Sequence, residues 1–227
     1  MPDGPIFGAY DPSAEVEITA RDLPHWFQPG VAIFVTFRTI DSMPQSVVEL
    51  WEREQTDWLA RQGYAISVKE LRDAGTRVLD RLPEALRAPF KKVRDRGWHE
   101  HLDKGHGECL LRSPALAAMV AESIETFDGD RYDLDCFVVM PNHVHVLLQC
   151  RSEWTLRRVA HSWLSFTARR INKALGRTGH FWQSEPFDHL VRSPEQFEHF
   201  RRYIAENSHR AGLKLGEFIH YSRDLQM

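Results

Sequence analysis

The sequence predicts an α+β fold, in which an antiparallel sheet of βαββαβ order carries helices on one face and is followed by a C-terminal helix. Short runs of β-branched and aromatic residues alternate with stretches whose apolar residues repeat at helical spacing. Two such runs are separated only by Pro141 and Asn142, which indicates a tight hairpin. Apolar residues make up 42% and charged residues 27% of the 227 residues, the balance of a globular protein with one sizeable core.

The first strand is expected over residues 31–39, a β-branched and aromatic run that follows the break at Pro29 and Gly30. A long charged region comes next, over residues 41–107, and its segment SVVELWEREQTDWLARQG is typical of an amphipathic helix. We therefore expect a single domain over residues 1–227 that holds a helical insertion at 41–107.

A helix and the two strands of the hairpin are expected after this insertion. Ser113 is placed as an N-cap and Pro114 as the first helical residue, and the helix should continue to Gly129. Its apolar stripe is formed by Leu116, Met119, Val120, Ile124 and Phe127. The hairpin strands are expected over residues 134–140 and 143–149.

A second long helix is expected over residues 154–175, because Gly176 is a typical C-terminal stop. The residues expected to face inward are Leu156, Val159, Trp163, Phe166 and Ile171. A strand over residues 181–192, broken at Pro186, follows this helix.

The last expected element is a helix that begins at the capping box formed by Ser193 and Gln196 and ends near Gly212. With it, the chain has the element order of a ferredoxin-like antiparallel sheet, extended by one C-terminal helix.

Several classes of protein are excluded by composition. No apolar run approaches the ~20 residues that span a bilayer, and the acidic first residues lack the apolar core of a secretory signal. The three cysteines are odd in number and show no CxxC spacing, so neither a disulfide framework nor a zinc knuckle is expected. We expect a cytoplasmic protein without a membrane partner.

The two parts of the chain differ in charge. Residues 1–150 carry 16 basic and 24 acidic side chains, whereas residues 151–214 carry 12 and 6. The basic excess is a candidate surface for a polyanion, although such residues often form only a solvated face. The candidate DNA contacts are Arg157, Arg158, Arg169, Arg170, Lys173, Arg201 and Arg202. Trp182 and Phe187 are either base-stacking residues or core residues.

Two histidines stand at alternate positions of the second hairpin strand. The strand period of two places His143 and His145 on one face and Val144, Val146 and Leu148 on the other. Two imidazoles in this arrangement can share one metal ion, and the alternative is that they are surface or core histidines.

The final helix carries two further candidates. Phe197, Phe200 and Ile204 form its apolar stripe, which leaves Tyr203 and Asn207, one turn apart, on a neighbouring face. A helix packed across the sheet could bring this face to the histidines. The alternative is that Tyr203 is a core residue and Asn207 belongs to the helix end.

Three segments of the sequence resemble the REP-associated tyrosine transposases, relatives of the single-tyrosine insertion-sequence transposases of the HUH endonuclease superfamily: MPNHVHVLL, HSWLSFTARRINKALGRTGHFWQSEPFDHLVRS and RRYIAENSHRAGL. FVTFR and HLDKGHGECLLRSP also resemble that family, so the likeness extends from about residue 23 to residue 213. The sequence departs from the family at Leu164, where a lysine is common, and at Ser208, where a proline is common.

The resemblance implies a metal site and a nucleophile. It implies that His143, His145 and Asn207 hold a divalent cation and that Tyr203 is the nucleophile. The chemistry of phosphodiester cleavage favours Mg²⁺ or Mn²⁺ in this role, and the absence of cysteine ligands argues against structural zinc. Gln183, Asp188 and His189 match a family strand motif without an assigned role, and His199 either orients Tyr203 or is solvated.

These observations favour a metal-dependent single-stranded DNA endonuclease and strand transferase, which acts beside a DNA hairpin through a covalent 5′-phosphotyrosine. A first alternative is a hairpin-binding protein without cleavage activity. A second is a zinc hydrolase, although no Asp or Glu ligand stands beside the histidines. We expect a nucleoid-associated monomer whose tyrosine acts in its own chain, with a dimer as the alternative.

Overall fold

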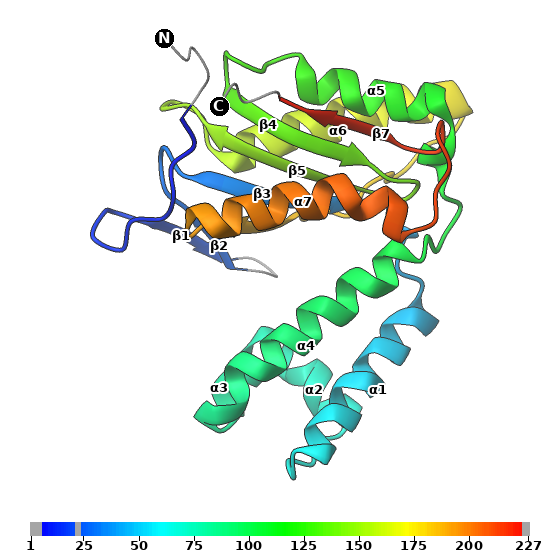
Figure 1. Ribbon diagram of the computed structural model, residues 1–227. Coiled ribbons are helices and arrows are strands. Elements are labelled where there is room, and N and C mark those ends of the chain that lie inside the picture. Colours follow the sequence, from blue (N-terminus) through cyan, green and yellow to red (C-terminus); the bar gives the residue numbers. More distant parts are fainter. Residues whose placement is uncertain (1–5, 21–23, 224–227) are drawn as a thin grey trace. The chain divides into compact units, whose positions relative to one another are not determined.

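The computed structural model describes residues 6–20 and 24–223, and it divides into two compact units (Figure 1). One unit combines residues 1–40 with 109–227, and the other spans Asp41–Glu108. Each unit has its own apolar clusters, so each is described by itself.

The first unit is built on a five-stranded antiparallel sheet of order β6-β3-β5-β4-β7. Its strands are β3 (Ala32–Arg38), β4 (Tyr132–Val139), β5 (His143–Cys150), β6 (Phe187–Leu190) and β7 (Ile219–Ser222). The four strands β6, β3, β5 and β4 have the order of a ferredoxin-like sheet, which confirms the predicted fold class. The fifth strand, β7, was not expected from the sequence.

Both faces of this sheet are covered by helices (Figure 1). The helices are α5 (Pro114–Glu125), α6 (Leu156–Leu175) and α7 (Pro194–Arg210). The two helices α5 and α6 share one apolar cluster with Ile33, Val35 and Val146. The third, α7, packs on the opposite face against Phe34 and Leu147. This division follows from the alternation of strand side chains, which sends neighbouring residues to opposite faces.

Two expectations for α6 and the following strand are wrong. Phe166 was expected to face inward, but 46% of it is exposed, and the Arg170 guanidinium lies 5.4 Å from its ring centroid. Phe166 lies at the rim of the buried stripe, where a helical period alone does not decide its side. The strand expected over 181–192 is regular only in β6, and Trp182 adds an isolated bridge to Thr39.

The helix start at Ser193 is only partly the expected capping box. The Ser193 hydroxyl accepts a hydrogen bond of 3.2 Å from the Gln196 amide. The Gln196 carboxamide accepts from the backbone N–H of Arg192 instead of that of Ser193. Ser193 and Gln196 therefore cap the N-terminus of α7, but the Gln196 side chain bonds one residue before the position of a capping box.

The first unit also contains a short antiparallel hairpin of β1 (Glu17–Ala20) and β2 (Pro24–Phe27). His25 of β2 contacts two carboxylates beside β6: its Nε2 lies 2.7 Å from Glu185 Oε1, and its Nδ1 contacts Asp188. These contacts fasten the hairpin to the edge of the large sheet.

The second unit is helical and occupies the region expected to be an insertion. It contains α1 (Gln45–Arg61), α2 (Val68–Ala74), α3 (Val78–Arg81) and α4 (Glu84–Asp103). Leu59 and Phe90 are among its fully buried residues, and Trp51 packs edge-on against Trp98 at 4.9 Å. No helix in the described ranges of either unit is both long and apolar enough to cross a membrane.

Candidate active site

The two histidines of β5 lie side by side on the sheet face that α7 covers. Their ring centroids are 4.7 Å apart, and each offers a ring nitrogen within 4.8 Å of the other's. His143 is 1% exposed and His145 is not exposed, so both imidazoles are withdrawn from water. The expected placement of both rings on one face is correct.

The side chain of His145 is held from three directions. Thr36 Oγ1 lies 2.7 Å from its Nδ1, and Phe34 stacks against its ring with centroids 5.3 Å apart. On the other side, the Tyr203 hydroxyl lies 3.4 Å from Nε2. Contacts of this kind fix the orientation of an imidazole that binds a metal.

The neighbouring residue Asn142 orients His143. Its Oδ1 lies 2.7 Å from His143 Nδ1, and a carboxamide oxygen can only accept a hydrogen bond. This contact suits the tautomer with the proton on Nδ1 and the lone pair on Nε2, which is a form of imidazole that coordinates a cation.

The apolar side of α7 places Tyr203 at the histidines. Phe200 stacks on Phe34 with centroids 4.4 Å apart, and Ile204 is fully buried against the sheet. Tyr203 lies at the edge of this contact, edge-on to Phe34 at 5.9 Å and to His145 at 5.1 Å. Asn207, one turn later, is 0% exposed.

The donor set suits a divalent cation that prefers nitrogen and oxygen ligands. His143 and His145 supply two imidazole nitrogens, and Asn207 is buried on the helix that carries Tyr203. A carboxamide oxygen is a suitable ligand for such a cation.

Most of the expected DNA contacts on α6 lie on the opposite side of the sheet from Tyr203. Arg157, Arg158, Arg169 and Lys173 are exposed, and none has a carboxylate within 4.0 Å in the described part of the chain. Arg170 instead pairs with Glu122 at 2.8 Å, and Arg158 lies over the Trp154 ring at 4.4 Å. The α6 cations and Tyr203 therefore belong to elements on opposite faces of the sheet.

Two of the expected DNA contacts have structural roles. Trp182 is 5% exposed, its Nε1 donates to Thr167 Oγ1 at 2.9 Å, and its ring packs edge-on against Phe37. Because neither ring face is open, base stacking by Trp182 is wrong and the core alternative is correct. Arg201 donates to the buried carboxylate of Asp135.

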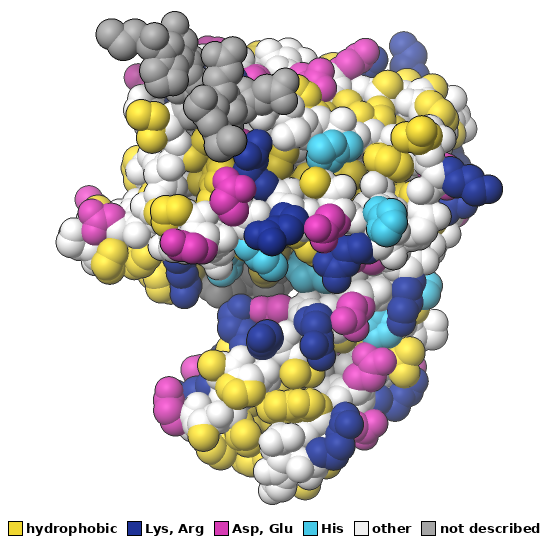
Figure 2. Space-filling model, viewed as in Figure 1, with side chains coloured by type: hydrophobic (Ala, Val, Ile, Leu, Met, Phe, Trp, Pro, Cys, Tyr) yellow, Lys and Arg dark blue, Asp and Glu magenta, His cyan; other side chains and the backbone are white. Residues whose placement is uncertain are grey.

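The remaining candidates on α7 lie at the surface, and those on or near β6 lie at the edge of the sheet. Arg202 and His199 are exposed, and the face of the molecule that carries α7 shows basic and acidic side chains interspersed (Figure 2). The motif residues of the strand have structural partners: Gln183 donates to the Ile40 carbonyl, Asp188 contacts His25, and His189 Nε2 lies 3.0 Å from Gln196 Nε2.

Sequence reasoning missed three residues around the histidines. Thr36 contacts His145, and Arg38 is the cross-strand neighbour of His143 in the pairing of β3 with β5. Burial lowers the pKa of Arg38 to about 10, so the guanidinium remains charged at neutral pH. Arg210 lies 5.8 Å from the Tyr203 ring centroid. The pairing of β3 with β5 could have predicted Thr36 and Arg38 as neighbours of the histidines. The seven-residue spacing from Tyr203 could have predicted Arg210.

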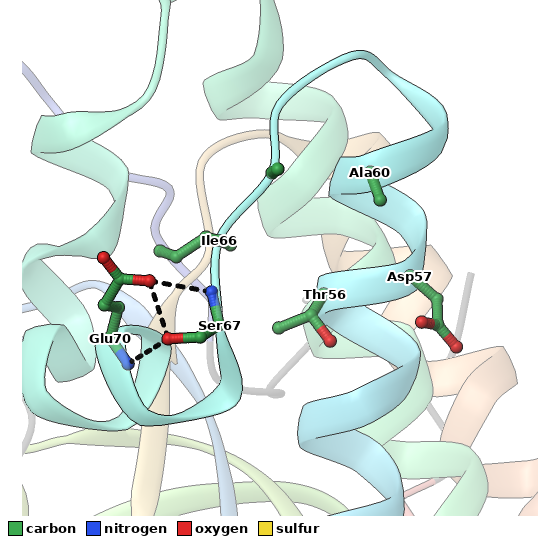
Figure 3. A pocket seen from close by; sticks show the side chains of 7 residues that line it. Thr56, Asp57, Ala60, Ile66, Ser67 and Glu70 are labelled. Carbon is green, nitrogen blue, oxygen red and sulfur yellow. Dashed lines mark hydrogen bonds between the residues drawn. The ribbon is translucent and has the colours of Figure 1, made fainter.

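An open hollow of about 420 Å³ lies in the second unit, where it is lined in part by Thr56, Ile66 and Glu70 (Figure 3). Its polar groups serve the start of α2. The Glu70 carboxylate accepts from the amide and the hydroxyl of Ser67, and the Ser67 hydroxyl accepts from the Glu70 amide. These mutual bonds form the N-terminal cap of α2.

Part of the first unit is similar to a known protein family. Residues 113–207 match the family described as "Transposase IS200 like". The matched segment contains His143, His145 and Tyr203 and ends at Asn207. The segment that holds the candidate site is therefore similar to the IS200-like transposases.

Curated proteins and solved structures were also compared. No curated protein matches the chain. One similar solved structure is described as "Structure of the REP associates tyrosine transposase bound to a REP hairpin"; it is 13% identical, covers 84% of this chain and 73% of its own, and has a TM-score of 0.44.

Proposed function

We propose that this protein is a metal-dependent single-stranded DNA endonuclease and strand transferase that uses Tyr203 as its nucleophile. The observation that carries the proposal is the contact of the Tyr203 hydroxyl with Nε2 of His145, at 3.4 Å, beside a second inward histidine. A phenol, a pair of imidazoles and a buried carboxamide within one segment form a site for phosphodiester cleavage, and the family match supports this chemistry.

In the proposed reaction, the Tyr203 oxygen forms a bond to phosphorus and the bond from phosphorus to the 3′ oxygen breaks. The phenol proton leaves Tyr203, and the departing 3′ oxygen takes up a proton. The product is a 5′-phosphotyrosine with a free 3′-hydroxyl, and reversal with another 3′-hydroxyl joins strands. Phe34 and His145 hold the phenol ring edge-on, so the hydroxyl is oriented before substrate binds.

His143, His145 and Asn207 are the residues that would hold Mg²⁺ or Mn²⁺. When bound, such a cation neutralises charge on the phosphate oxygens and favours the phenolate form of a nearby tyrosine. The chain's own contribution is to fix both imidazoles, through Asn142 and Thr36, with the ring nitrogens close together.

The partner that the resemblance implies is single-stranded DNA beside a REP-type hairpin. The exposed cations of α6 suit contact with phosphates. Because they lie on the opposite side of the sheet from Tyr203, we expect them to contact DNA away from the cleaved bond. We propose that the protein acts as a monomer, in which the tyrosine attacks DNA bound by its own chain, and that it is associated with the nucleoid.

A second function is binding of hairpin DNA without cleavage. The observation that favours it is the separation of the α6 cations from Tyr203 by the sheet, because a basic surface of this kind could bind DNA without the site.

One experiment separates the two functions. Wild type and Tyr203→Phe are incubated with Mn²⁺ and labelled single strands that carry hairpins, and covalent adducts are detected after denaturation. We expect an adduct with wild type only, equal hairpin affinity for both proteins, and an adduct with the control Tyr221→Phe, which removes a hydroxyl from β7. Absence of any adduct from wild type would favour the binding function, and an adduct from Tyr203→Phe would move the nucleophile elsewhere.

A further inference from the structure

Three polar residues lie along the side of α7 that carries Tyr203. Tyr203, Asn207 and Arg210 stand at positions i, i+4 and i+7, and the seven-residue step returns to within about 20° of the starting direction on a helix. The guanidinium carbon of Arg210 lies 5.8 Å from the centroid of the Tyr203 ring. This cation is therefore placed beside the proposed nucleophile.

Arg210 differs from the other arginines of α7. Arg201 is held by the buried carboxylate of Asp135, and Arg202 points about 100° away from Tyr203 around the helix. Arg210 is exposed, and no carboxylate within the described ranges lies within 4.0 Å of it. Its charge is therefore available to an anion that reaches the tyrosine.

We propose that Arg210 binds a non-bridging oxygen of the phosphodiester that Tyr203 attacks and holds the phosphorus in line with the hydroxyl. This inference rests on the proposed function and assigns a phosphate ligand to a residue outside the histidine pair.

The geometry and the charge balance both favour this role. A reacting phosphorus must approach the Tyr203 oxygen to about 3–3.5 Å, which brings its outer oxygens beside the ring that Arg210 overlies. His143, His145 and Asn207 bring no carboxylate that would compete for the guanidinium. A guanidinium fork matches two phosphate oxygens, and such charge-assisted hydrogen bonds are about twice as strong as neutral ones.

A structural role must be separated from this one. Arg210 is the last residue of α7, and a cation there interacts favourably with the negative end of the helix dipole. A purely structural arginine would be replaced equally well by lysine, and its loss would lower the melting temperature without regard to the charge of any DNA linkage.

The test combines a protein change with a change at one phosphate. Arg210→Ala and Arg210→Lys are made in the wild-type and Tyr203→Phe backgrounds, with Arg192→Ala as the control for loss of an exposed cation at the other end of α7. The DNA probes are hairpin-flanking single strands that carry one methylphosphonate, which removes the linkage charge, at successive positions. Adduct rates are measured in the wild-type background and equilibrium affinities in the Tyr203→Phe background.

We expect Arg210→Ala to lower the adduct rate at least tenfold on the all-phosphodiester strand and to weaken binding about tenfold. On the strand whose methylphosphonate replaces the contacted phosphate, Arg210→Ala should lower the adduct rate and the affinity very little. The contact is already lost on that strand. Arg210→Lys should recover part of the rate, and Arg192→Ala should match wild type.

The outcomes distinguish this inference from the proposed function. If wild type forms no adduct but one linkage still shows the coupling in the binding series, the endonuclease proposal fails and the phosphate contact stands. If wild type forms the adduct and the loss caused by Arg210→Ala is the same at every methylphosphonate position, the contact is overturned. An equal loss of affinity caused by Arg210→Ala at every methylphosphonate position would overturn the contact as well.

Discussion

Arg201 Nε donates a hydrogen bond of 2.9 Å to Oδ2 of Asp135, a residue with no exposure to solvent. Asp135 occupies the β-bulge of β4, where the register against β5 shifts between Leu134 and Cys136. Burial raises the pKa of the Asp135 carboxyl, and the positive charge of Arg201 opposes this rise. The pair fastens α7 to the sheet two residues before Tyr203.

We expect Arg201→Ala to destabilise the protein by about 3 kcal/mol, because it leaves a buried carboxylate without its cation. Adding Asp135→Asn should recover part of this loss, since the double variant buries no unpaired charge. Urea unfolding measures both, and Arg202→Ala is the matched control, expected within about 0.5 kcal/mol of wild type. Destabilisation by Arg201→Ala no greater than that of the control would show that the pair does not anchor α7.

Metal binding should depend directly on the histidine pair. His143→Ala removes one of the two proposed imidazole ligands, so we expect Mn²⁺ affinity to fall at least about tenfold while the melting temperature of the metal-free protein changes little. Because two imidazoles and one carboxamide bring no carboxylate to the cation, we also expect modest affinity for Mg²⁺ and Mn²⁺ and ready removal by EDTA. Calorimetric titration with Mn²⁺ checks this, with the exposed His161→Ala as control. Unchanged affinity in His143→Ala would refute the metal assignment.

DNA binding should weaken with salt in proportion to the phosphates that α6 contacts. Replacing Arg169 and Lys173 by glutamine should reduce the slope of log affinity against log salt by about 0.7 for each lost contact on single strands. Arg170→Gln should leave the slope nearly unchanged, because Arg170 is paired with Glu122. Fluorescence anisotropy over a salt series measures the slopes. A slope identical in all variants would mean that the α6 cations are only solvated.

The His25 cluster should make the stability of the first unit depend on pH. Burial opposes protonation of His25, but the hydrogen bonds and charges of Asp188 and Glu185 outweigh it and raise the pKa of the imidazole above 6.5. The stabilisation is therefore fully present below about pH 6.5 and is lost as the pH rises through the raised folded-state value. We expect the melting temperature of wild type to exceed that of His25→Gln by more at pH 6 than at pH 8.5. A constant difference across this range would contradict the assignment.

Local structure and the identity of the chemical groups could be predicted from the sequence. The alternation in MPNHVHVLL decided that His143 and His145 share a face, because strand side chains alternate whatever the rest of the fold does. The apolar stripe of Phe197, Phe200 and Ile204 likewise decided which side of the last helix packs inward.

Which distant groups meet depends on how the helices and strands pack. It put α7 and α6 on opposite faces of the sheet, so that the α6 cations lie away from Tyr203, and it gave Arg201 to Asp135 and enclosed Trp182 in the core. Local periodicity tells whether a side chain points inward or outward, but not which partner the fold places opposite it. The role of an arginine or a tryptophan depends on that partner, because an ion pair or a buried ring face is no longer available to DNA.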